Sequence, residues 1–106
     1  MPGIALVPLY PETLPAGREP VEATVLIRMD PGRGYRAHRH EGVEEVYVLE
    51  GGYRDERGEY RAGDYVRYEE GSVHSPVALG RDDRPISDEN PACVLFASAR
   101  GGITLV

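Results

Sequence analysis

The chain has 106 residues and a mass of 11.7 kDa, the size of one domain. Its 12 basic and 18 acidic residues give a net charge of −6, which disfavours nucleic-acid binding because proteins of that class carry basic patches. Thirteen glycines and nine prolines interrupt the sequence often and so disfavour long helices.

The sequence also points to a cellular location. No apolar run approaches the ~20 residues that a membrane span requires, and the N-terminus lacks the pattern of a signal peptide. The single cysteine, Cys93, excludes an intramolecular disulfide and suits a reducing compartment, so we expect a cytoplasmic protein. The chain has no lysine or glutamine, and Asn90 is its only amide side chain, a composition typical of a thermophile or of an arginine-biased genome.

The first part of the chain, residues 1–20, differs from the rest because it holds five of the nine prolines. Proline fixes φ and removes a hydrogen-bond donor, so we predict an extended arm with at most edge pairing. Its apolar residues suggest that the arm packs on the remaining domain, residues 21–106, or on a partner subunit. We expect a homodimer.

From residue 21 onward the pattern is that of short strands separated by glycine-rich or proline-rich turns. Strands are expected at residues 23–29, 46–49, 53–54, 59–61, 64–68, 93–97 and 103–106. Residues 53–61 form a hairpin around a turn at 55–58, and the polar residues 80–91 form a loop or, alternatively, a lid. The chain is therefore predicted to be all-β, as a sandwich or a barrel.

The residues with metal-binding chemistry are concentrated in two places. His38 and His40 are two positions apart, so an extended backbone directs both imidazoles to one face. Glu44 has the same parity, and His74 is the remaining histidine. Three neutral imidazoles and one carboxylate suit a first-row divalent metal. An octahedral ion held by four protein groups keeps two positions open for substrate, water or dioxygen.

These residues resemble the motifs of the cupin superfamily. The first motif is met at every spacing by Gly32, the His38–His40 pair, Glu44 and Gly51, and the second motif is matched by Gly63, Gly71 and His74. Glu69 stands where the second motif has proline, and Ala78 stands where it has asparagine. The local sequence of residues 48–56, 65–67 and 71–76 is most similar to that of small ChrR-type cupins.

The resemblance implies a double-stranded β-helix, or jelly-roll barrel, with a metal ion inside it. The implied ligands are His38, His40, Glu44 and His74, holding one divalent transition metal per chain (Fe, Zn, Mn or Ni). The ChrR-type group includes zinc-binding domains of anti-sigma factors and iron dioxygenases similar to the enzyme that cleaves acetylacetone.

Three further residues are candidates for supporting the ligands or contacting a substrate. Arg36 shares the parity of His38, and Cys93 occupies an apolar strand that the resemblance places near the barrel interior. Tyr47 is one of the six tyrosines in residues 21–106, among which the sequence alone does not select a supporting residue. The alternative interpretations are a solvated guanidinium for Arg36, an inert buried thiol for Cys93 and a packing role for Tyr47.

Three functions remain open. The first hypothesis is a metal-dependent oxygenase acting on a small organic molecule. The second is a non-catalytic metal or ligand sensor, which we expect less because residues 1–20 contain no cysteine or histidine for the helical zinc module of anti-sigma factors. The third is a sugar isomerase or epimerase, because one fold hosts many activities.

Overall fold

The computed structural model describes residues 3–11 and 22–106, and within these ranges all regular structure is β. Five strands form the largest sheet, in the order β1-β2-β10-β4-β7. These strands are β1 (Ile4–Tyr10), β2 (Glu22–Met29), β4 (Glu44–Glu50), β7 (Tyr65–Tyr68) and β10 (Cys93–Arg100). All four neighbouring pairs are antiparallel.

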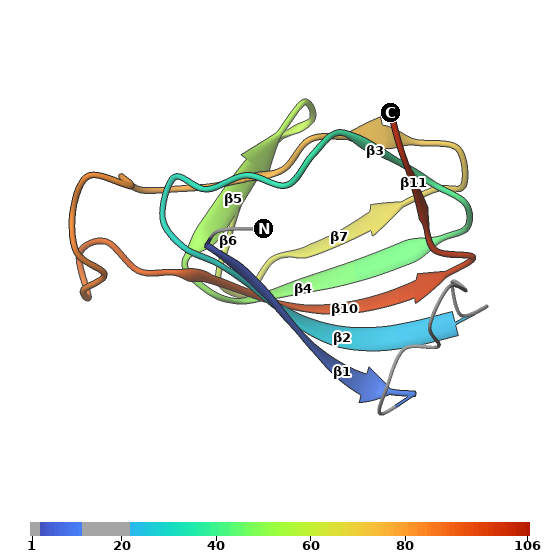
Figure 1. Cartoon of the computed structure of the whole chain (residues 1–106), viewed down its shortest axis with the longest axis horizontal. Coiled ribbons are helices and arrows are strands. Elements are labelled where there is room, and N and C mark those ends of the chain that lie inside the picture. The colour runs from blue at the N-terminus through green and yellow to red at the C-terminus, as the bar shows by residue number, and fades with distance from the viewer. Residues whose placement is uncertain (1–2, 12–21) are drawn as a thin grey trace.

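Two three-stranded sheets complete the barrel, and Figure 1 shows β3, β5 and β11 lying across from the five-stranded sheet. One has the order β11-β3-β8 and is built from β3 (His38–His40), β8 (Val73–His74) and β11 (Ile103–Leu105). The other has the order β6-β5-β9 and is built from β5 (Gly52–Asp55), β6 (Gly58–Arg61) and β9 (Val77–Ala78). The predicted all-β jelly-roll architecture is confirmed.

Side-chain alternation along the strands creates the core. In β4, Val46 and Val48 are 3% and 2% exposed, whereas the intervening Tyr47 is 46% exposed, because successive side chains of a strand point to opposite faces. The inward-facing residues of the sheets meet in one cluster. Its members are Met29, Val46, Val48, Tyr53, Val66, Tyr68, Ala78, Cys93, Leu95 and Ala97.

Glycine permits the barrel to turn its corners. Gly51 follows β4 with a φ of 62°, and Gly71 precedes β8 with a φ of 84°. L side chains rarely adopt this left-handed region, so glycine is favoured at both positions. The other two glycines of the cupin motifs, Gly32 and Gly63, also have positive φ.

The predicted arm is only partly within the described residues. Residues 4–10 form β1, which pairs with β2 at the edge of the five-stranded sheet, the position where Pro8 is tolerated in a strand. Gly3 and Pro11 are also among the described residues, whereas residues 1–2 and 12–20 of the predicted arm lie outside them.

The polar segment 80–91 is a loop organised by Asn90. The Asn90 side chain accepts a hydrogen bond from the Arg81 amide and donates to the carbonyl groups of Arg81, Arg84 and Pro85. None of residues 80–91 lines the cavity beside the histidines, so the loop does not cover it as a lid in this structure. In the described ranges no helix is long and apolar enough to cross a membrane.

Candidate metal centre

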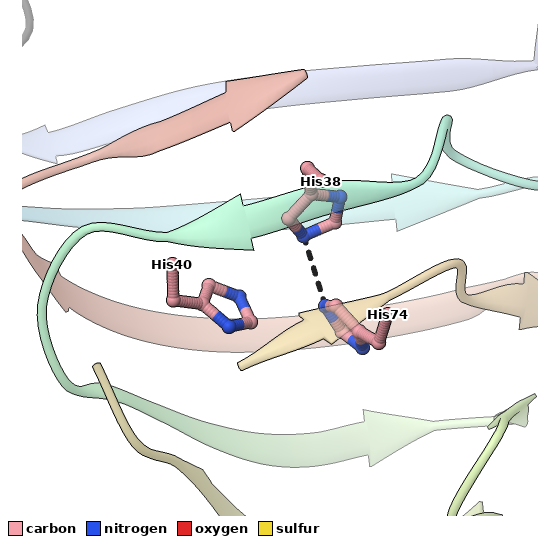
Figure 2. A group of neighbouring side chains, drawn as sticks. All are labelled: His38, His40 and His74. Carbon is pink, nitrogen blue, oxygen red and sulfur yellow. Dashed lines mark hydrogen bonds between the residues drawn. The ribbon is translucent and has the colours of Figure 1, made fainter. Parts of the chain in front are cut away.

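Two neighbouring strands bring the three histidines together. In β3, His38 and His40 are 6% and 1% exposed and flank the exposed Arg39, as the predicted alternation requires. β8 pairs with β3 so that His74, which is 5% exposed, lies opposite His38. One ligand atom from each ring lies within 4.8 Å of the others, and Figure 2 shows the rings converging. Three buried imidazoles at this spacing could hold a metal ion.

Hydrogen bonds define the tautomers of His38 and His74. The Nδ1 atom of His38 lies 2.8 Å from the Arg36 carbonyl oxygen, and the Nδ1 atom of His74 lies 2.9 Å from Oδ2 of Asp55. A carbonyl group and a carboxylate can only accept, so both Nδ1 atoms carry the proton. The Nε2 atom of each ring therefore presents its lone pair to the centre of the cluster.

His40 reaches the same tautomer through a hydroxyl group. Ser72 Oγ donates its one proton to the Glu69 carbonyl oxygen at 2.6 Å, so it must accept from Nδ1 of His40 at 3.0 Å. The Nε2 atom of His40 is buried and has no hydrogen-bond partner among the residues that the structure describes. A buried lone pair without a partner is costly, unless a cation binds it.

The distance between two of these nitrogen atoms gives a direct test of fit. Burial lowers the pKa of both His38 and His74, so both rings are neutral at pH 7. Their Nε2 atoms are 2.9 Å apart, which places two lone pairs against each other. Imidazoles bound at right angles to one ion, with bonds of ~2.0–2.1 Å, have nitrogen atoms about 3 Å apart. The arrangement therefore fits a divalent transition metal.

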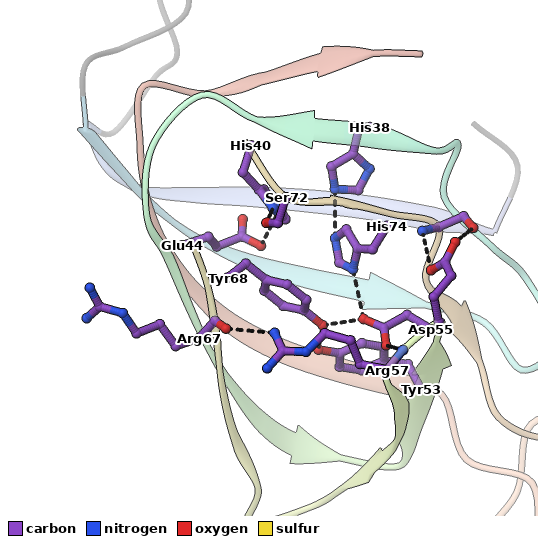
Figure 3. A network of polar contacts seen from close by, with 12 residues as sticks. His38, His40, Glu44, Tyr53, Asp55, Arg57, Arg67, Tyr68, Ser72 and His74 are labelled. Atoms are coloured by element: carbon purple, nitrogen blue, oxygen red, sulfur yellow. Dashed lines mark hydrogen bonds and ion pairs between the residues drawn. The ribbon is translucent and has the colours of Figure 1, made fainter. Parts of the chain in front are cut away.

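Glu44 approaches the cluster from the facing sheet. It is the first residue of β4, its side chain is 15% exposed, and its Oε1 atom lies 3.3 Å from Nε2 of His40. Figure 3 shows the carboxylate directed toward the histidines. Its neighbour Glu45 has the opposite parity and points outward. The Oε1 atom of Glu45 lies 3.5 Å from Nη1 of Arg67. Glu41, the alternative carboxylate, is exposed and accepts a hydrogen bond from Arg39.

A buried chain of hydroxyl groups supports Asp55 behind His74. Tyr68 donates to Oδ2 of Asp55 at 2.6 Å, so the hydroxyl of Tyr53, also at 2.6 Å, must donate to Tyr68. Burial raises the pKa of both tyrosines, which keeps these hydroxyl groups protonated. Burial would also raise the pKa of Asp55, but the hydrogen bonds from Tyr68, His74 and the Arg57 amide outweigh it and lower that pKa. A charged carboxylate therefore faces Nδ1 of His74.

The β5–β6 hairpin also fixes the backbone beside His74. The carboxylate of Glu56, next to Asp55, accepts hydrogen bonds from the amide and the hydroxyl group of Ser75 at 3.0 and 2.7 Å. The hairpin thus holds both the ring of His74 and the residue that follows it. Carboxylate partners of this kind orient a metal-binding imidazole and raise its basicity.

An apolar cavity of about 50 Å³ lies beside the histidines, large enough for a few water-sized groups. Tyr35 stands at its edge with its ring 5.3 Å from that of His38 in a T-shaped contact. The imidazole and carboxylate groups at the cavity are those of the candidate ligands His38, Glu44 and His74. The other lining residues are Ile27, Met29, Tyr35, Val46, Tyr53, Pro76 and Leu95.

The three additional candidates from the sequence lie away from the cavity lining. Arg36 is exposed and contributes only its backbone carbonyl group, to His38. Cys93 is fully buried in the hydrophobic core, and burial raises the pKa of its thiol to about 12. Tyr47 lies on the outer face of β4, because the neighbouring Val46 and Val48 face inward. Tyr47 is therefore not a neighbour of the histidines.

Sequence reasoning did not identify the groups that support the ligands. The sequence pattern predicts a hairpin turn at Asp55 and indicates no role for Ser72. The hairpin pairs with β9, which follows His74 in the chain, and this pairing brings Asp55 to His74. A long-range pairing of this kind cannot be recognised from a local sequence pattern. The one available signal for such a support is the acidic residue Asp55, which directly follows the expected strand 53–54.

Solved structures share the fold of this chain. An acetylacetone dioxygenase from Acinetobacter johnsonii superposes with a TM-score of 0.73 at 14% identity, covering 98% of this chain and 64% of that one. A cupin-like protein of unknown function from Ralstonia eutropha gives a TM-score of 0.74 at 18% identity, covering 98% and 59%. At such identities these likenesses establish the fold alone.

The chain belongs to the ChrR cupin-like domain family, whose sequence model matches residues 9–86. The anti-sigma factor ChrR of Rhodobacter sphaeroides, solved in complex with SigE, is 28% identical with a TM-score of 0.67, covering 92% of this chain and 45% of that one. The chain thus spans about half to two thirds of the length of these three structures. Among curated proteins, none matches the sequence.

Proposed function

We propose that this cupin is a metal-dependent oxygenase that acts on a small, largely apolar organic molecule. It holds one divalent transition metal (Fe, Zn, Mn or Ni) per chain through His38, His40, Glu44 and His74. The observation that carries the proposal is the direction of three histidine Nε2 lone pairs toward one point beside an apolar cavity. Four protein ligands would leave an octahedral ion with open positions for substrate and dioxygen.

The protein contributes position, charge and exclusion of water, while the metal would supply Lewis acidity and redox chemistry. The Nδ1 partners hold each imidazole in the tautomer that donates from Nε2. Glu44 adds one negative charge, which offsets part of the charge of a divalent cation. Apolar walls formed by residues such as Ile27 and Leu95 keep the site dry.

The lining also narrows the class of substrate. Of the two tyrosines at the cavity, Tyr53 already donates its hydroxyl proton to Tyr68. A sugar would bury many hydroxyl groups against hydrocarbon, at a cost for each unpaired group. A substrate with one or two metal-binding oxygen or sulfur atoms and an apolar body suits this lining. The oxygenase is therefore favoured over the sugar isomerase or epimerase.

Oxygen consumption by the iron-loaded protein tests the proposal. The protein is loaded with Fe(II) without air, and oxygen uptake is measured with β-diketones, thiols and phenols. We expect uptake in proportion to one added substrate class. Glu44→Gln should reduce iron content and uptake together, whereas Glu45→Gln, one residue away and directed outward, should retain both. Absence of uptake with every class would overturn the oxygenase assignment.

A regulatory function is the second candidate, because the ChrR relative is an anti-sigma factor in complex with SigE. In that case the metal site would act as a sensor, and binding of a partner would replace turnover. The test mixes the purified chain with a purified sigma factor from the same source, with and without metal. A stoichiometric complex that depends on metal occupancy would place regulation first.

We propose the cytoplasm as the location for either function, in keeping with one buried, reduced cysteine.

A further inference from the structure

A continuous apolar row crosses the outer face of the five-stranded sheet. The cross-strand register aligns one outward residue from each strand. In sheet order these residues are Val7, Leu26, Phe96, Tyr47 and Tyr65. We call this set the outer apolar row, and it lies on the side of the sheet opposite the barrel interior.

The outer apolar row is accessible. Val7, Tyr47 and Tyr65 are 53%, 46% and 47% exposed. The Tyr47 ring packs 4.9 Å from the Tyr65 ring and 6.4 Å from the Phe96 ring, which forms an aromatic surface across three strands. Leu49, 50% exposed, extends it along β4. Contiguous apolar surface on a small domain commonly marks a protein interface, and aromatic residues are enriched there.

Two opposite charges lie on either side of β10, beyond one edge of this row. Val94 in β10 is the cross-strand neighbour of Arg28 in β2 and of Glu50 in β4. A positive and a negative side chain thus flank the central strand at the same level. Within residues 3–11 and 22–106, the charged partner of Arg28 is Asp30 at 3.7 Å, and both side chains are solvated.

We propose that a second copy of this chain packs on the outer apolar row, with a two-fold axis parallel to β10. Such an axis exchanges β2 with β4 and β1 with β7, so the interface is self-complementary. Leu26 then faces Tyr47 of the partner subunit, and Val7 faces Tyr65 of the partner subunit. Arg28 faces Glu50 of the partner subunit, and the symmetry repeats each contact.

Alternative modes of pairing are less suitable. A two-fold axis across the strands would place the Glu45 and Glu50 levels of β4 over each other and bring like charges together. Strand addition at β1 is opposed by Pro8, which lacks a backbone donor at that edge. With the axis along β10, Arg100 faces its own copy, but Glu22 is its cross-strand neighbour in each chain and offsets the charge.

This dimer keeps the candidate metal centre accessible. Tyr47 of the outer apolar row and Val46 of the cavity lining are successive residues of β4 on opposite faces. The proposed interface therefore covers the back of the sheet that carries Glu44. Dimerisation can be measured without any assumption about the reaction.

The molar mass of the full chain in solution tests the proposal. By sedimentation velocity at micromolar concentration we expect a dimer, and Tyr47→Glu should produce a monomer. Val73→Glu is the matched control, because Val73 is 51% exposed but lies in β8, outside the outer apolar row. It should remain a dimer. A monomeric wild type overturns the proposal, as does a dimer that survives Tyr47→Glu.

A charge exchange tests the geometry independently of the apolar contacts. Arg28→Glu and Glu50→Arg should each weaken the dimer by about tenfold or more, because each creates two like-charge pairs across the interface. The double variant should restore the wild-type dissociation constant. Circular dichroism checks that each variant folds. Additive weakening in the double variant would exclude the axis along β10.

Discussion

Each of the three histidines donates from Nδ1 to a different kind of acceptor: a backbone carbonyl group, a hydroxyl group and a carboxylate. These acceptors fix the tautomers, and so the direction of the lone pairs. The carboxylate of Asp55 is the one charged acceptor of the three. It therefore has the largest effect on the basicity of its imidazole.

Replacing Asp55 should disturb the orientation of the His74 ring while His74 itself stays in place as a ligand. In Asp55→Asn the amide can turn its NH₂ group toward Nδ1, which favours the tautomer that withdraws the Nε2 lone pair. We expect zinc affinity to fall by about 10–100-fold. The measurement is a competition titration against a chelator. Asp83→Asn, at an exposed residue paired with Arg81, is the control and should leave affinity unchanged.

The thiol of Cys93 should be inert in the native protein. Burial raises its pKa to about 12, and the thiolate is the reactive form. Because the folded pKa exceeds the ordinary value, the associated stability is retained below pH ~8.5 and declines as pH rises toward the folded pKa. At pH 8, a disulfide reagent should label Cys93 only after denaturant is added. Rapid stoichiometric labelling of the folded protein would contradict this prediction.

The sequence predicted that the histidines gather at one site, but it did not predict the groups that hold their rings, such as Asp55 and Ser72. The i, i+2 spacing sufficed for His38 and His40, because strand alternation is a local property. The face of Tyr47 could also have been inferred, since Glu44, Val46 and Val48 share the inward parity. Asp55 and His74 are 19 positions apart, and their contact depends on the pairing of the β5–β6 hairpin with β9, which a local pattern does not specify.

At the scale of strands and turns, Gly51 should tolerate substitution least among the barrel corners. Its φ is 62°, and an added Cβ would lie 2.5 Å from the Ala92 carbonyl oxygen. Gly63 also has a positive φ, 96°, but a Cβ there would meet nothing within 4 Å. Gly63→Ala should cost about 1–2 kcal/mol for the backbone conformation alone. Gly51→Ala should cost more, because backbone atoms must also move.

Urea unfolding of both variants at equal metal content measures this difference. Equal losses of free energy would show that the Ala92 contact relaxes without cost.

At this scale the sequence predicted most strands, because β-branched runs end at glycine or proline. The two-residue strands β8 and β9 were missed, since their pairing with β3 and β5 gives too short a pattern to recognise.

For the whole molecule, metal binding should raise the unfolding temperature. The converging Nε2 atoms exist only in the folded chain, so binding stabilises that state by about 2.7 kcal/mol at 100 times the dissociation constant. For a domain of this size, that corresponds to a shift of roughly 10–20 °C. Calorimetry with and without a chelator measures the shift, and His40→Ala should abolish it. No shift on stripping the wild-type protein would contradict the four-ligand site.

The metal-free wild type in the same experiment tests the proposed thermophilic origin. A midpoint above the ~45–65 °C range of mesophilic domains would agree with the near absence of amide side chains. A midpoint inside that range would favour an arginine-biased genome as the source of the composition.

The histidines belong to the β11-β3-β8 sheet, whereas Glu44 begins a strand of the five-stranded sheet. An ion bound to both would be a cross-link between two layers that the sequence, with one cysteine, cannot join by a disulfide. Removal of the ion would then loosen the barrel selectively where the β11-β3-β8 sheet meets the five-stranded sheet. Amide hydrogen exchange would detect such opening in β3 and β8 before it reached the β2–β10 pair at the centre of the large sheet.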